Sequence, residues 1–159
     1  MASKTDFSPE EWQTIASAPL ITAMYIAMAD MSGPIGLIKE MQAAVTAVLD
    51  AAKEYDALPV IKDIALDFHG RQLSPELPRF TDSQEAQTYV ETEVLRAIAL
   101  VEGVSPADGP VFREWLYTTA ERTAEASKEG GFLGFGGTRV SEKERFALSQ
   151  LAVILGVTR

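Results

Sequence analysis

Apolar residues recur at steps of three and four along most of the chain, which is the spacing of one face of an α-helix. The pattern is clearest after Pro34, where polar residues fill the opposite face. No segment alternates apolar and polar residues with a period of two between hairpin turns, so the sequence offers no strand. We therefore predict an all-α fold. The apolar positions after Pro34 are Leu37, Ile38, Met41, Ala44, Val45, Val48, Leu49 and Ala52.

Helix-start signals divide the chain into about seven helices. Ser8-Pro9-Glu10-Glu11 combines an N-cap serine, a proline at the first helical position and a glutamate at the third. Pro19 is predicted to end or kink this helix, and a second helix is expected from Leu20 to about Ala29. Five more helices are predicted to begin after Pro34, at Pro59, at Thr81 or Asp82, at Pro106 and after Ser141.

Helix ends and apolar stripes predict further details. Gly70 is expected to close one helix as a left-handed C-cap, and Gly156 to close the last. Trp12 and Trp115 fall on apolar stripes and are predicted to lie in the core. The final helix is expected to be heavily buried through Phe146, Leu148, Leu151, Ile154 and Leu155.

Size and charge narrow the classes of function. With 159 residues the chain is most simply a single helical domain, 1–159. It has no cysteine, which excludes disulfides, zinc thiolate sites and thiol catalysis. The net charge is −9 and the basic residues are scattered, so nucleic acid is not expected as a partner.

Export and membrane insertion are not predicted. Residues 1–18 lack the continuous apolar core of a signal peptide, and a cytoplasmic location is expected. The longest apolar run, Leu20 to Ala29, is about half of the roughly 20 residues that a transmembrane helix needs.

The segment Gly130–Gly137 holds five of the 11 glycines and is predicted to be part of a connector, 130–140, before the last helix. The spacing from Gly131 to Thr138 is similar to a phosphate-binding loop. However, Gly137 occupies the position of the essential lysine, and the segment follows a helix instead of a strand. Nucleotide binding is therefore disfavoured.

The three large apolar residues of this segment, Phe132, Leu133 and Phe135, permit two interpretations. In the first they fold back on the bundle. In the second they form an interaction loop that inserts into a groove of another subunit, a partner or a membrane surface. Arg139 and Lys143 would then meet anionic headgroups in a peripheral membrane contact.

Catalytic motifs are lacking. His69 is the only histidine, so sites with paired histidines are excluded. Asp63 and Asp67 share the helix face opposite the apolar stripe, and we predict that they are ordinary surface acids instead of metal ligands with His69. The serines occupy caps and turns, where local hydrogen bonds account for them. The sequence therefore predicts a protein that is not an enzyme.

A weak internal repeat suggests two related helical halves. Ile26–Asp30 and Ile98–Glu102 each end an apolar helix on an acid, and each is followed by a turn containing glycine, serine and proline and by a long amphipathic helix. In a bundle built from two such hairpins the two acids would occupy equivalent places.

With this repeat, residues 20–128 resemble the TerB-like family of tellurite-resistance proteins, small helical bundles with acids at their turns that are linked to metal ions. The resemblance implies a divalent cation site for Ca²⁺ or Mg²⁺ at Asp30 and Glu102, and Asp108 is a further candidate ligand because hard cations favour clustered carboxylates. The sequence departs from the family pattern in two places, because the acid-then-glycine turn of the first half reads Asp30-Met31-Ser32-Gly33 and Glu102 replaces an aspartate in the second half. The tail from Gly130 resembles uncharacterised bacterial proteins.

Three hypotheses follow. The leading one is a non-enzymatic interaction or stress-response protein without a cofactor, which uses the glycine-rich segment or an apolar groove to bind a protein partner or itself. The second is a TerB-like protein that binds Ca²⁺ or Mg²⁺. The third is an enzyme with a site assembled from residues distant in sequence, and no sequence motif supports it.

Overall fold

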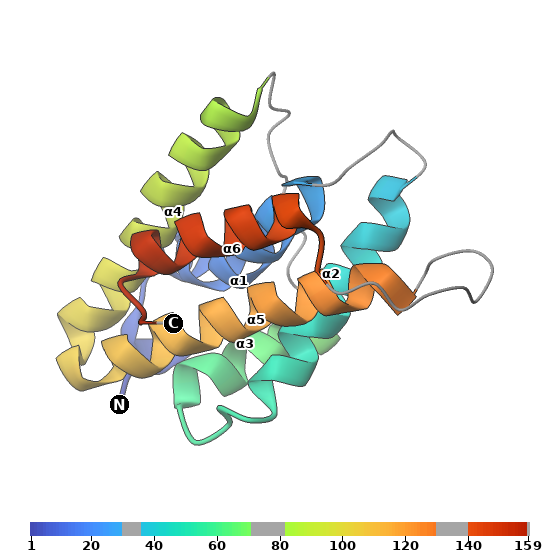
Figure 1. Cartoon of the computed structure of the whole chain (residues 1–159). Helices are drawn as coiled ribbons and strands as arrows, with labels where there is room; N and C mark the ends of the chain where they lie inside the picture. Colours follow the sequence, from blue (N-terminus) through green and yellow to red (C-terminus); the bar gives the residue numbers. More distant parts are fainter. Residues whose placement is uncertain (30–35, 71–81, 130–139, 159) are drawn as a thin grey trace.

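The computed structural model describes residues 1–29, 36–70, 82–129 and 140–158. Within these ranges it contains six α-helices and two short 3₁₀-helices and no strand, which confirms the all-α prediction (Figure 1). The elements are η1 (Lys4–Asp6), α1 (Pro9–Ala29), α2 (Gly36–Ala52), α3 (Pro59–His69), α4 (Ser83–Val104), η2 (Pro106–Asp108), α5 (Gly109–Glu129) and α6 (Glu142–Leu155).

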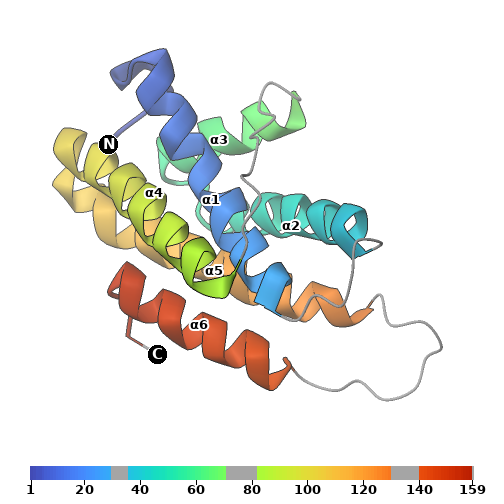
Figure 2. The same ribbon diagram turned by 90° about the horizontal axis from the view of Figure 1, so that it is seen from above.

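Helices α1 and α5 form the centre of the bundle. Each packs against the other and against α2, α4 and α6. In Figure 2, α1 crosses between α4 and α2, and α6 lies alongside α5 at the edge of the molecule. Helix α3 packs on α2 and on η1. The arrangement therefore surrounds α1 with apolar partners.

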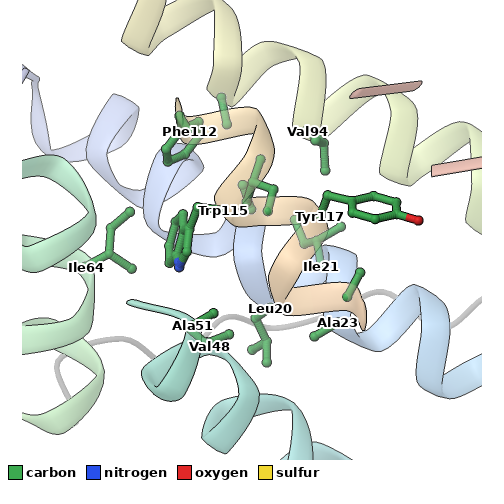
Figure 3. Close-up of a cluster of buried hydrophobic side chains, with 14 of the residues drawn as sticks. Leu20, Ile21, Ala23, Val48, Ala51, Ile64, Val94, Phe112, Trp115 and Tyr117 are labelled. Carbon is green, nitrogen blue, oxygen red and sulfur yellow. The ribbon is translucent and has the colours of Figure 1, made fainter. Parts of the chain in front are cut away.

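The core lies where these helices meet. Trp12 and Trp115 are both buried, as the apolar stripes predicted. The rings of Phe112 and Trp115 pack with their centroids 5.6 Å apart. Figure 3 shows the convergence of Leu20, Ile21 and Ala23 of α1, Val48 and Ala51 of α2, Ile64 of α3, Val94 of α4, and Phe112, Trp115 and Tyr117 of α5.

The prediction that Pro19 divides the first helix was wrong. Helix α1 runs without interruption from Pro9 to Ala29 with Pro19 inside it, which reduces the expected seven helices to six. A proline within a helix removes one backbone hydrogen bond, at a cost of about 3 kcal/mol. Because Pro19 and most of the residues after it are buried, packing against four neighbouring helices offsets that cost.

Helix α1 also contains the longest apolar run. Its residues 20–24 are buried by the surrounding helices. In the ranges that the structure describes, no helix is both long enough and apolar enough to cross a membrane.

Capping boxes form at two of the predicted helix starts. Ser8 N donates to Glu11 Oε2 (2.9 Å), and Glu11 N donates to Ser8 Oγ (3.3 Å). Hydrogen bonding to Ser8, mainly through its backbone amide and secondly through its side chain, holds the pKa of Glu11 below its usual range. Ser141 N donates to Glu144 Oε2 (2.8 Å), and Glu144 N donates to Ser141 Oγ (3.2 Å). These caps fix the first turns of α1 and α6.

The glycines at two predicted helix ends differ. Gly156 ends α6, as expected, and its φ of 67° lies in the left-handed region. Gly70 instead has φ of −75° and ψ of −1°, and its N–H donates to Leu66 O (2.9 Å). The prediction of a left-handed cap at Gly70 was therefore wrong, because the chain leaves α3 through a right-handed conformation that does not require glycine.

Two polar atoms in the core have no hydrogen-bond partner within the described ranges. They are Trp115 Nε1 and Thr119 Oγ1, which lie one turn apart on α5 and are fully buried. One turn further, the buried Thr123 differs, since its Oγ1 donates to Thr119 O (2.8 Å). Burying a hydroxyl without a partner costs about 1–3 kcal/mol in proteins.

We therefore expect Thr119→Val to raise the free energy of unfolding by about 1 kcal/mol, because valine has nearly the same shape without the unpaired hydroxyl. Thr123→Val is the matched control and should lower it by about 1 kcal/mol, because its hydrogen bond is lost. Urea unfolding monitored by circular dichroism measures both values. A loss of stability in Thr119→Val would contradict the interpretation.

Candidate functional site

The end of α1 lies near the starts of α4 and α6 (Figure 2). Residues from these three segments line an apolar groove of about 530 Å³. The three helices come from distant parts of the sequence, so none of them forms the groove alone. The lining residues are Tyr25, Met28 and Ala29 of α1, Asp82, Ala86 and Gln87 at the start of α4, and Glu142, Lys143, Phe146 and Ala147 of α6.

Differences in side-chain size create the groove. Ala86 and Ala147 are buried but small, so they leave space between α4 and α6. Tyr25, Met28 and Phe146 provide the larger apolar surfaces around that space. The Asp82 side chain accepts from Glu85 N (2.8 Å), which fixes the first turn of α4 beside the groove.

Phe146 is 66% exposed, so the prediction that it is buried in the final helix was wrong. Leu148, Leu151 and Leu155 fill the core-facing side of α6, which leaves Phe146 and Val153 on another side. Val153 is 79% exposed and lies two turns beyond Phe146. An exposed phenyl ring at the edge of an apolar groove is typical of a surface that binds another molecule.

The rim of the groove carries two acidic side chains and one basic side chain. The exposed side chains of Asp82 and Glu142 lie on it, together with Lys143. An adjoining shallow hollow on α4 shares Asp82 and adds Glu85 and Glu93. The whole chain carries a net charge of −9, so the electrostatic field around the groove attracts cationic groups.

Two tyrosines lie at or next to the groove. Tyr25 lines it, and Tyr89 lines a small adjoining void together with Tyr25, Met28 and Ala86. Burial raises the pKa of Tyr25 above its ordinary value, and burial followed by the charge of Glu93 does so for Tyr89. Both phenols therefore stay protonated at neutral pH and keep a hydroxyl hydrogen to donate.

The predicted cation ligands have other partners where the structure describes them. Glu102 Oε1 accepts from Arg113 Nε (3.0 Å) and Nη2 (2.9 Å), and Arg113 Nη1 donates to Leu155 O (3.0 Å). Gly109 allows this approach, because a Cβ at that position would collide with the Glu102 side chain. This arrangement ties the end of α4 to α5 and to the end of α6.

Asp108 is buried, and its Oδ2 accepts from Ala2 N (2.6 Å). Asp30 lies outside the described residues. Among the described residues, no three Asp, Glu or His side chains gather in a way that could hold a metal ion. The Ca²⁺ or Mg²⁺ site at Asp30, Glu102 and Asp108 stays a prediction.

The interaction loop predicted at Phe132, Leu133 and Phe135 also lies outside the described residues, as does Arg139. Lys143, which was expected beside this loop, lies on the rim of the groove. The described part of the predicted interaction surface is therefore the start of α6.

The prediction that Asp67 is an ordinary surface acid was wrong. Asp67 is 7% exposed, and its carboxylate accepts from Lys4 Nζ (2.8 Å to each oxygen) and from Trp12 Nε1 (2.7 Å). Asp63 Oδ2 accepts from Lys4 N (2.9 Å). The N-terminal segment thus covers the polar face of α3, which the pattern of that helix alone could not reveal.

These acidic clusters differ from the groove. The carboxylates of Asp67 and Glu102 are held in ion pairs with Lys4 and Arg113, which favours a structural role. The groove instead exposes apolar surface. No family model, curated protein or solved structure matches the chain. The groove's concave, mostly apolar lining with a few polar groups is the geometry of a binding site.

We expect Asp67→Ala to lower the free energy of unfolding by about 2–3 kcal/mol, because it leaves the buried Trp12 Nε1 and the Lys4 ammonium without an acceptor. Asp63→Ala is the matched control on the same helix and should cost about 1 kcal/mol, because only one backbone hydrogen bond is lost. Chemical unfolding measures the difference. Equal losses of unfolding free energy in the two variants would show that the contacts of Asp67 contribute no more to stability than the single hydrogen bond of Asp63.

Proposed function

We propose that this protein is a non-enzymatic interaction module whose groove binds an amphipathic helix of a partner protein. The apolar face of that helix packs against Phe146, Met28 and Tyr25, and its basic residues face Asp82 and Glu142. The observation that carries the proposal is the exposed phenyl ring of Phe146 at the edge of an apolar groove.

The size and shape of the groove support this mode of binding. Its volume of about 530 Å³ falls within the range of roughly 300–1,000 Å³ typical of ligand pockets. It is bounded by helices on three sides, which suits the insertion of anchor residues from one face of a helix. A flexible methionine, Met28, allows the wall to adapt to side chains of different shape.

The charges at the groove and on the whole chain support the proposal of a basic partner. Asp82 and Glu142 on the rim would pair with lysine or arginine residues, and the net charge of −9 would accelerate their approach. The same charge repels anionic membranes and acidic proteins. A cationic amphipathic helix is therefore favoured over an anionic membrane surface, which was one of the partners that the sequence allowed.

A direct test uses two synthetic helix-forming peptides, one with leucines on one face and lysines on the other, and one with glutamates in place of the lysines. We expect the lysine peptide to bind and the glutamate peptide not to bind, with affinity falling as salt rises. Isothermal titration calorimetry measures both. Equal binding of the two peptides would contradict the proposed role of the acidic rim.

Phe146→Ser should weaken binding of the lysine peptide by roughly tenfold or more, since aromatic anchors contribute most to such interfaces. Val153→Ser is the matched control, because Val153 is an equally apolar and exposed residue of α6 outside the groove, and it should change affinity less than about twofold. An unchanged affinity in Phe146→Ser would remove the groove as the site. A dimer in sedimentation analysis that Phe146→Ser dissociates would favour self-association, and stronger binding to anionic vesicles than to the peptide would favour a membrane.

A further inference from the structure

Methionine supplies all the sulfur in this chain, which has five methionines and no cysteine. Two of them, Met24 and Met28, lie one turn apart on α1, in the part of the helix that borders the groove and the small void next to it. Hydroperoxides convert a thioether to a sulfoxide, which changes a flexible apolar side chain into a polar one. The wall that α1 provides therefore contains a group whose polarity a single oxidation changes.

The two methionines differ in accessibility. Met24 is 4% exposed and lines the void but not the groove. Met28 is partly exposed and lines both. Because an oxidant must contact the sulfur atom, a solute that enters the groove reaches Met28, whereas the surrounding helices shield Met24. The accessible sulfur is thus the one in the wall of the candidate binding site.

Apolar surface surrounds Met28 on both sides. Its neighbours in the lining of the groove include Tyr25 and Phe146, and those in the void include Ile21 and Val90. A sulfoxide oxygen at this position is a hydrogen-bond acceptor that needs water, and a helix packed over it would remove that water without replacing the hydrogen bond. The oxidised wall is therefore a poorer surface for an apolar helix face than the thioether.

We propose that Met28 is an oxidation site, and that its conversion to the sulfoxide by a hydroperoxide lowers the affinity of the groove for its partner helix. This inference rests on the function proposed above. In the reaction a lone pair of the sulfur attacks one peroxide oxygen, the S–O bond forms and the O–O bond breaks. The sulfur loses two electrons. The leaving oxygen takes up the proton of the transferred oxygen, so hydrogen peroxide yields one molecule of water.

The test compares the wild-type chain with Met28→Leu before and after treatment with hydrogen peroxide, which is removed before calorimetric titration with the lysine peptide. Leucine has nearly the volume of methionine and no sulfur, so the untreated variant should bind within about threefold of the wild type. Oxidation should weaken binding by the wild type roughly tenfold or more, and binding by Met28→Leu less than about twofold. Every other methionine is shared, so the difference isolates Met28.

The outcomes separate this inference from the proposed function. An affinity of the wild type that oxidation leaves unchanged, or an equal loss in Met28→Leu, would overturn the inference and leave the proposed function standing. An untreated protein that does not bind the lysine peptide would overturn both. Peptide mapping of the treated wild type should show the sulfoxide forming at Met28 roughly tenfold faster than at Met24, and equal rates would contradict the difference in accessibility.

A second measurement needs no variant. Since coupling between two events is reciprocal, a bound helix should slow the oxidation of Met28 by roughly fivefold or more when the lysine peptide is saturating. The glutamate peptide, which is not expected to bind, should leave the rate unchanged. Peptide mapping over a time course of peroxide treatment measures both rates. Equal oxidation of Met28 in the presence of the two peptides would overturn the proposal.

Discussion

The burial of α1 by four other helices is the interaction on which the rest of the structure depends. An α-helix that is apolar on most sides is stable in water only when other helices surround it. Packing of this kind holds Pro19 within a continuous helix and brings α4 and α6 together on the same partner. The groove forms at the end of α1, where Met28 and Ala29 are only partly covered. The candidate site is thus a direct result of how the central helix is enclosed.

Carboxylates of α3 and η2 hold the N-terminal segment against the rest of the fold. The N-terminal segment contributes the Lys4 ammonium and the amides of residues 2 and 4, all of which meet carboxylates of α3 or η2. Since buried charges are tolerated only with partners, these contacts fix the register of the segment against α3 and η2. The acidity of the chain therefore has two roles, because some acids organise the interior while others, such as Glu142, remain on the rim of the groove.

Local features could be predicted from the sequence, and long-range ones could not. The amphipathic faces and the caps at Ser8 and Ser141 depend on residues within one or two turns, and these predictions were confirmed. The burial of Asp67 depends on Lys4, some 60 residues away, so a helix pattern could not show it. Phe146 looked like a core residue because its spacing is helical, yet only the packing of α6 decides which of several apolar sides faces inward. The groove itself requires Ala86 and Ala147, two small residues whose proximity no local pattern encodes.

Arg113 fixes the position of α6, one of the three helices that line the groove. It holds the last turn of α6 through Leu155 O and is itself held by Glu102. The groove lies at the other end of this helix, which is roughly 20 Å long. A rotation of α6 about this held turn would displace Phe146 further than Leu155, because Phe146 lies nearer the opposite end of the helix. The pairing of Arg113 with Glu102 therefore bears on the width of the groove, although neither residue lines it.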